Sequence, residues 1–173
     1  MSLKIIIAGL AAAALLSVPV ARVWSGELNA PHAQLFHADA NPRQDLADAK
    51  NKVAKEHRLV MVIFGANWCP DCLALHRNLS AGATQEYAQH NFEVINVDVG
   101  EKDRNLDFAK DLGVTLKKGI LVAAILQDGK VIATTNQGEL EASRHYPPQQ
   151  ILSFMHEIVE NRRVTFPAAE PAP

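Results

Sequence analysis

The two cysteines of the chain, Cys69 and Cys72, are separated by two residues in the stretch GANWCPDCLALH, residues 65–76. Two thiols at this spacing can form and break a disulfide with each other, which is the chemistry of thiol–disulfide exchange. A disulfide that closes so short a loop constrains the unfolded chain only weakly, so a purely structural bridge is the poorer explanation. The spacing therefore favours a redox-active pair.

Binding of a soft metal is the second chemistry that these residues could support. His76 follows Cys72 by four residues, so the cysteine pair and His76 together offer three soft ligands. A structural zinc site needs four ligands, and the chain has no second cysteine pair. We therefore expect no metal here and His76 as a polar residue on a helix surface. A carrier of copper or another soft metal stays open as the alternative function.

The elements on either side of the pair place the two sulfurs differently. The apolar run LVMVIF, residues 59–64, predicts a buried strand, and a helix is expected from about residue 69 to 79. Cys69 then lies at the helix N-terminus, where unpaired N–H groups and the helix dipole favour a thiolate. Pro70 is compatible with the first helical turn. Cys72 lies one turn deeper, so Cys69 is expected to attack and Cys72 to resolve the mixed disulfide.

The rest of the chain predicts an α/β fold. Hydrophobic periodicity and turn signals predict further helices in residues 41–58, 102–113 and 147–163, and further strands in residues 92–99, 120–126 and 130–135. Strands separated by helices imply parallel pairing, and the closing hairpin at Asp128-Gly129 adds an antiparallel edge. We therefore expect a central mixed sheet with helices on both faces.

The stretch VMVIFGANWCPDC, residues 60–72, resembles the active-site strand and turn of the thioredoxin superfamily. The similarity covers roughly residues 44–163, and within the superfamily it is greatest to exported bacterial proteins. One of these is the C-terminal periplasmic domain of the membrane thiol:disulfide interchange reductase. The resemblance implies a thioredoxin-like fold without a cofactor. It implies Cys69 as nucleophile, Cys72 as resolving thiol, Trp68 packed beside the site, and Pro70 and Asp71 as residues that tune the redox potential.

The chain lacks two residues that the family pattern includes. The buried acid six residues before the first cysteine is Ile63 here, so proton transfer to the resolving thiol needs water or Asp71. The cis-proline that faces the cysteines is replaced by Leu121, which follows Ile120. A cis bond before a non-proline residue costs about 2.5–4 kcal/mol, so we expect the Ile120–Leu121 bond to be trans. In relatives this loop binds substrate peptide, which gives Ile120 and Leu121 an expected substrate-binding role.

Asp71 is the third departure because it places a carboxylate between the two sulfurs. Its charge opposes a thiolate at Cys69, whereas the helix terminus favours one by about 0.3–1 kcal/mol. In partly exposed surroundings the two effects are of similar size. The pKa of Cys69 is therefore expected to resemble that of reducing members of the family.

The N-terminal residues indicate export. A basic start, MSLK, precedes an uncharged run over residues 5–21, so residues 1–26 are expected to be a signal peptide or a membrane anchor. Residues 27–40 are then a linker, residues 41–166 the thioredoxin-like domain and residues 167–173 a disordered tail. Export to the bacterial periplasm places the thiols in an oxidising compartment.

These observations combine into one expected function. We expect an exported thiol–disulfide oxidoreductase, more a reductase than an oxidase, whose partners are protein disulfides and dithiols. A membrane protein is a candidate electron donor. A net charge of −2 gives no indication of nucleic-acid binding. A redox-inert interaction domain is the remaining alternative, and the polar segment of residues 136–146 has no assigned role.

Overall fold

The computed structural model describes residues 34–162 and 164. The expected signal peptide or anchor (residues 1–26) and the expected disordered tail (residues 167–173) lie outside this range, as does the first half of the expected linker (residues 27–33). Within the described part of the chain, no helix combines the length and apolar character needed to cross a membrane.

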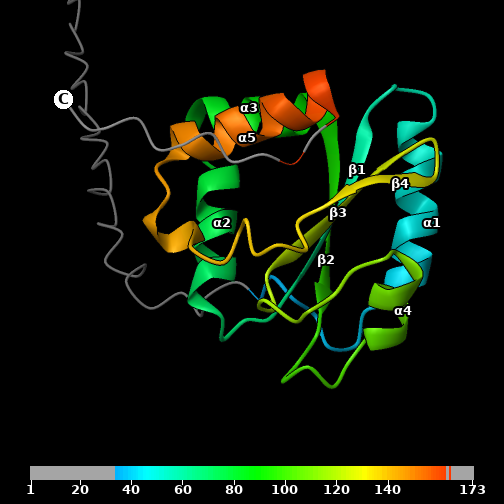
Figure 1. The fold of residues 1–173 in the computed structure, drawn as a ribbon. Helices are drawn as coiled ribbons and strands as arrows, with labels where there is room; N and C mark the ends of the chain where they lie inside the picture. The colour runs from blue at the N-terminus through cyan, green and yellow to red at the C-terminus, as the bar shows by residue number, and fades with distance from the viewer. Residues whose placement is uncertain (1–33, 163, 165–173) are drawn as a thin grey trace, which may run out of the picture. The chain divides into compact units, whose positions relative to one another are not determined.

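A mixed four-stranded sheet forms the centre of the domain (Figure 1). The strands are β1 (Leu59–Gly65), β2 (Phe92–Asp98), β3 (Val122–Gln127) and β4 (Lys130–Thr134), in the spatial order β2-β1-β3-β4. β1 runs parallel to β2 and antiparallel to β3, and β4 runs antiparallel to β3. The predicted mixed sheet and α/β class are confirmed.

The direction of β3 corrects one expectation, because a strand reached through a helix was predicted to be parallel to its neighbours. The connecting helix α4 (Leu106–Asp111) has six residues and is therefore about 9 Å long, whereas a seven-residue strand spans about 23 Å. This helix is too short to carry the chain back to the end of the sheet where β1 and β2 begin. β3 therefore begins beside the end of β1, where Val122 pairs with Phe64, and runs back.

Helices cover both faces of the sheet, as the sequence predicted (Figure 1). One face carries α1 (Pro42–Val53) and α4, and the other carries α2 (Pro70–Leu79), α3 (Gly82–Asn91) and α5 (Pro148–Asn161). Asn41 caps α1 by accepting the Gln44 N–H at 3.3 Å, and Pro42 occupies its first turn. Helix α3 was not predicted from the sequence, because its only buried residues, Thr84 and Ala88, give it a weak amphipathic pattern.

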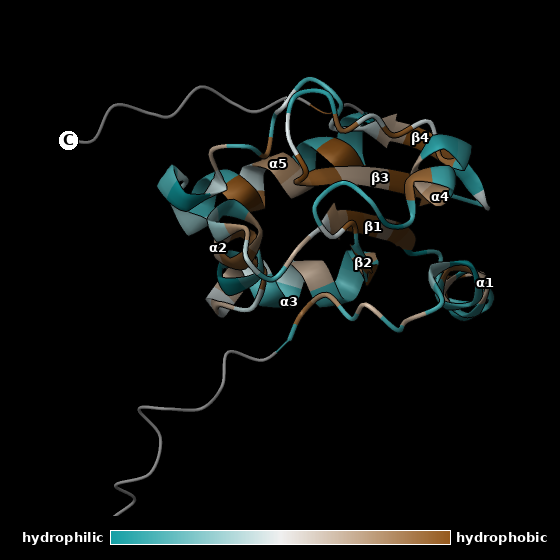
Figure 2. Cartoon of the chain, turned by 90° about the horizontal axis from the view of Figure 1, so that it is seen from below, coloured by the Kyte–Doolittle hydropathy of each residue, from teal (hydrophilic) through white to brown (hydrophobic). Residues whose placement is uncertain are grey.

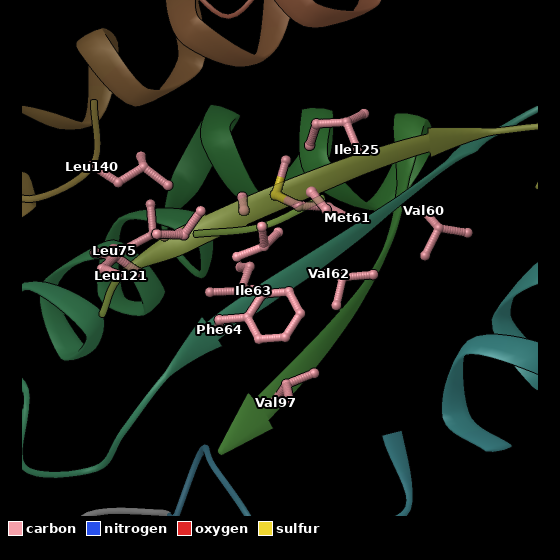
Figure 3. Packing of buried hydrophobic residues seen from close by; sticks show 14 of the residues in the cluster. Val60, Met61, Val62, Ile63, Phe64, Leu75, Val97, Leu121, Ile125 and Leu140 are labelled. Carbon is pink, nitrogen blue, oxygen red and sulfur yellow. The ribbon is translucent and has the colours of Figure 1, made fainter. Parts of the chain in front are cut away.

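The hydrophobic core lies on both sides of β1 and β3, which are enclosed by the helices (Figures 2 and 3). All seven residues of β1 are buried, as its uninterrupted apolar sequence predicted. Irregular segments also contribute to the core: Phe36 precedes α1, and Leu140 lies between β4 and α5. The C-terminal ends of β1 and β2 and the start of β3 lie at the same end of the sheet. The cysteines come directly after β1 at this end.

Candidate active site

Cys69 and Cys72 form a disulfide at the N-terminus of α2, with their Cα atoms 5.3 Å apart. Cys69 is the N-cap residue, and its Sγ accepts a hydrogen bond from the Cys72 N–H at 3.2 Å. Pro70 occupies the first turn, where its missing N–H costs no hydrogen bond. The predicted position of the first sulfur at a helix N-terminus is confirmed.

The two cysteines differ in their access to solvent. Cys69 is 6% exposed, whereas Cys72 is 0% exposed. Trp68 next to them is 55% exposed, and its indole N–H donates to the Gly100 carbonyl at 3.3 Å. Both cysteines are thus buried, and Cys69 keeps the little exposure that the pair has.

The enclosure of Cys72 depends on the segment before α1. A Cβ built on Gly65 would lie 2.9 Å from Cys72 Sγ and 2.7 Å from the Phe36 ring, so only glycine fits between them. Asn67 holds this segment in place. Its Oδ1 accepts the Leu35 and Phe36 N–H groups at 2.9 and 3.1 Å, and its Nδ2 donates to the Phe36 carbonyl at 2.6 Å. Phe36 and Cys72 Sγ therefore both lie against Gly65.

Ile120 and Leu121 are buried at the start of β3. No peptide bond of the described residues is cis, so the expected trans bond between them is confirmed. The Leu121 N–H, a donor that proline would lack, donates to Oε1 of Glu141 at 3.0 Å. A Cβ on Gly119 would overlap the Glu141 carboxylate, so the loop is shaped around this acid.

Glu141 is half-buried, and its pKa is raised above the ordinary value of a glutamate. Desolvation is the main cause, and the negative charge of Asp71 adds to it. The hydrogen bond from the Leu121 N–H and the positive charge of Lys102 act in the opposite direction. A second carboxyl group therefore lies near the Cys-Pro-Asp-Cys turn.

Asp71 corrects another expectation, because it was placed in partly exposed surroundings and is in fact only 5% exposed. Both of its oxygens are bound by Arg144 from the short 3-10 helix η1 (Ser143–His145). Oδ1 accepts from the backbone N–H at 2.9 Å and from Nε at 3.1 Å, and Oδ2 accepts from Nη2 at 2.8 Å. The carboxylate between the sulfurs is thus paired with a cation 73 residues away in sequence.

Ile63, at the position of the family's acid, is fully buried and pairs in register with Asn96 of β2. His76 corrects the expectation of a surface residue, since it is half-buried and packs edge-on against Phe36 with ring centroids 5.6 Å apart. Its Nε2 and the Asn96 Oδ1 are buried near each other, and neither makes a hydrogen bond of normal geometry. Desolvation lowers the pKa of His76, and Asn96 offsets part of this effect.

The alternative of a soft-metal site gains no support from this arrangement. In the part of the chain that the structure describes, no three side chains of His, Cys, Asp or Glu are grouped so that they could hold a metal ion. Cys69, Cys72 and His76 are therefore not brought together as a ligand set. The imidazole interacts with Phe36 and Asn96 instead.

Comparison with known proteins identifies the family. A family model described as thioredoxin-like matches residues 41–149, which is more than half of the chain. The chain belongs to the thioredoxin-like family. This thioredoxin-like chain is also similar to a solved structure, the disulphide isomerase from Xylella fastidiosa Temecula1. The two are 34% identical, with a TM-score of 0.70, over 77% of this chain and 99% of that one.

A second solved structure, Fasciola hepatica thioredoxin, is 24% identical to this thioredoxin-like chain. The match covers 57% of this chain and 89% of that one, with a TM-score of 0.39.

Four residues of this thioredoxin-like site were missed by the sequence analysis, namely Phe36, Asn67, Glu141 and Arg144. Phe36 lies in the expected linker, and Asn67 was read only as part of the turn before Cys69. Glu141 and Arg144 fall in the polar segment of residues 136–146, whose unusual length was the one signal that pointed to it. Their roles depend on contacts across the fold, which no local pattern reveals.

Proposed function

We propose that this protein is an exported thiol–disulfide oxidoreductase that acts as a reductase of protein disulfides. The observation that carries the proposal is the difference between the two sulfurs at the N-terminus of α2. Cys69 is 6% exposed beside the exposed Trp68, whereas Cys72 is fully buried one turn deeper. An attacking thiol and a sheltered resolving thiol are the two parts that thiol–disulfide exchange needs.

The reaction begins with the reduced dithiol. The Cys69 thiolate attacks one sulfur of a partner disulfide, and the partner's S–S bond breaks as one partner thiolate leaves. The Cys72 thiol then loses its proton and attacks the Cys69 sulfur. The mixed disulfide breaks, the second partner thiolate leaves, and the Cys69–Cys72 disulfide forms. Two electrons have passed from this protein to its partner, which takes up two protons.

Several observations support the finer parts of this proposal. The Trp-Cys start of the motif and the acid between the cysteines resemble reducing members of the family. The basic N-terminal start followed by an uncharged run supports export to the periplasm. The similar protein from Xylella is described as a disulphide isomerase. Reduction and isomerisation both begin with attack by a reduced thiol, so a membrane electron donor fits as the source of electrons.

Replacing Cys72 with alanine tests the proposal. Because the resolving thiol is lost, partners should remain covalently attached to Cys69 after exchange, and they should be released by dithiothreitol. The matched control is Cys69→Ala, in which the remaining thiol is enclosed and should capture nothing. Equal capture by both variants, or none by Cys72→Ala, would contradict the proposal and favour a redox-inert interaction domain.

A further inference from the structure

The ion pair between Asp71 and Arg144 is built into the redox turn. The guanidinium binds one carboxylate oxygen through Nε and the other through Nη2, at 3.1 and 2.8 Å, and the backbone N–H of Arg144 adds a third hydrogen bond. This two-point geometry fixes the orientation of both groups, which a simple charge contact would not. The side chain of Arg144 is itself 50% exposed, so the cation is supplied from the surface to a buried acid.

The segment that carries Arg144 is anchored to α2 and to itself. Asn78 Nδ2, near the end of α2, donates to the Tyr146 carbonyl at 3.1 Å. The Tyr146 hydroxyl donates to the Glu139 carbonyl at 3.2 Å, and the Ser143 hydroxyl donates to the Leu140 carbonyl at 2.6 Å. Because Ser143 is fully buried, the backbone on which Arg144 sits is fixed independently of the ion pair.

Two fields of opposite sign act where a Cys69 thiolate forms. The N-terminus of α2 stabilises the negative sulfur, and the Asp71 carboxylate two residues later destabilises it. Because Asp71 is buried, its charge is poorly screened by water and its effect on the sulfur is larger than at a surface. Arg144 places a positive charge on both oxygens of that carboxylate and cancels most of this repulsion.

Charged groups lie around the turn on several of the described elements. They are Asp71 on α2, Arg144 in η1, and Glu141 in the loop before η1, with Lys102 acting on Glu141 from the loop after β2. The buried Asp98, in register with Gly65 before the turn, is paired with Arg104. His76 lies one turn beyond Cys72 and is held as the neutral form by burial. Arg144 is therefore the cation that contacts the turn directly.

We propose that Arg144 is a positioning residue that keeps Cys69 reactive by neutralising the buried carboxylate of Asp71. The proposal rests on the proposed function and deepens it, since it assigns the role of residues 136–146. Arg144 transfers no electron or proton. It sets the fraction of Cys69 that is present as the attacking thiolate, which determines the rate at which a partner disulfide is attacked.

The test measures the reduced thiol itself in a Cys72→Ala background, where Cys69 is the single cysteine of the chain. The rate of alkylation by iodoacetamide between pH 5 and 10 gives the pKa of Cys69. Arg144→Gln should raise this pKa by about one, so that alkylation below the pKa slows about tenfold. Arg144→Lys keeps the charge but loses the two-point geometry. The pKa of Cys69 in this variant should lie between those of the parent and of Arg144→Gln.

The double variant Asp71→Asn/Arg144→Gln separates charge from structure. It removes both charges and keeps similar shapes, so the pKa of Cys69 should return to within about 0.3 of the parent, a twofold difference in alkylation rate. Arg77→Gln is the matched control, because it removes an exposed positive charge from α2, the helix that Cys69 caps. It should change the alkylation rate less than twofold. Circular dichroism establishes that each variant is folded.

Either of two results would overturn the proposal. The first is an unchanged pKa in folded Arg144→Gln, and the second is a double variant as slow as the single one, which would show a purely structural role. Alkylation needs no partner protein, so this measurement gives its answer whether or not Cys72→Ala captures partners. Failure of Arg144 to act and failure of the proposed exchange function are thereby distinguishable.

Discussion

At the level of single residues, the site combines two buried polar contacts that the family pattern does not contain. Asp71 is bound by Arg144, and His76 lies beside Asn96 near the buried Ile63, at the level where relatives carry an acid. Because both oxygens of Asp71 accept hydrogen bonds from Arg144, this carboxylate is poorly suited to take a proton from Cys72. His76 is half-buried one helical turn away with a lowered pKa, and its energetic effect on the fold can be measured.

Lowering the pH should destabilise the protein through His76. Its pKa is lowered in the folded state by burial, whereas in the unfolded chain it titrates near 6.5. Above about pH 6.5 both states are neutral, and this residue adds no pH dependence. Below it the unfolded chain binds a proton that the folded protein does not, so stability falls, by at most about 1.4 kcal/mol per pH unit, until the folded pKa is reached.

Urea unfolding of the oxidised protein at pH 5.5, 6.5 and 7.5 measures this effect. His76→Gln keeps a polar group beside Asn96 but cannot titrate, so its free energy of unfolding should change less between pH 6.5 and 5.5 than that of the parent. Equal changes in the two proteins would show that His76 is not protonated on unfolding in this range.

Local motifs were sufficient to predict the residues that carry the chemistry. Cys69, Cys72 and Pro70 follow from two-residue spacing and helix-start rules, which depend only on neighbouring positions. The environments of Asp71 and His76 were predicted wrongly, because each is determined by a residue on another element, Arg144 for one and Phe36 with Asn96 for the other. Without knowledge of these contacts, polar residues such as these are predicted to be exposed to solvent.

At the level of secondary structure, the pairing of β3 with the end of β4 is completed by a side chain. The Thr135 hydroxyl, fully buried just after β4, accepts the Ala123 N–H at 2.7 Å, while the Thr135 N–H donates to the Ala123 carbonyl at 2.9 Å. The sequence predicted the hairpin because Asp128-Gly129 is a strong local signal. It did not predict the antiparallel β1–β3 pairing or α3, since these depend on the length of α4 and on weakly amphipathic residues.

Replacing Thr135 with valine should destabilise the fold by about 1–3 kcal/mol, because the buried Ala123 N–H loses its acceptor while the volume is unchanged. The measurement is the free energy of unfolding in urea. Thr134→Val, at a half-exposed position of the same strand, is the control and should change stability by less than about 0.5 kcal/mol. Similar losses in both variants would mean that the hydroxyl of Thr135 contributes nothing specific.

At the level of the whole molecule, the buried residues of the described core extend along the chain from Phe36 to Ile158. It includes a residue from the segment expected to be a linker, since Phe36 is buried against Gly65. The overall α/β architecture was predictable because β1 and β3 are uninterrupted apolar runs. The contribution of Phe36 was not, because a single aromatic residue in a polar stretch has no periodicity to reveal its burial.

Two truncations should therefore behave differently. A chain that begins at residue 33 keeps every residue of the described core and is the reference for the unfolding midpoint in urea. A chain that begins at residue 41 loses Phe36 and should be less stable by about 3–5 kcal/mol, the usual cost of deleting a buried phenylalanine. Equal midpoints for the two truncations would contradict the packing of Phe36 against Gly65.

The clamp of Asn67 on Leu35 and Phe36 also fixes where the chain enters the domain, only a few residues from the reactive sulfurs. The backbone two residues before Cys69 and the segment of Leu35 and Phe36 are thus coupled through one side chain. A substitution at Asn67 therefore acts on the lining of the core and on the approach to the redox turn at the same time.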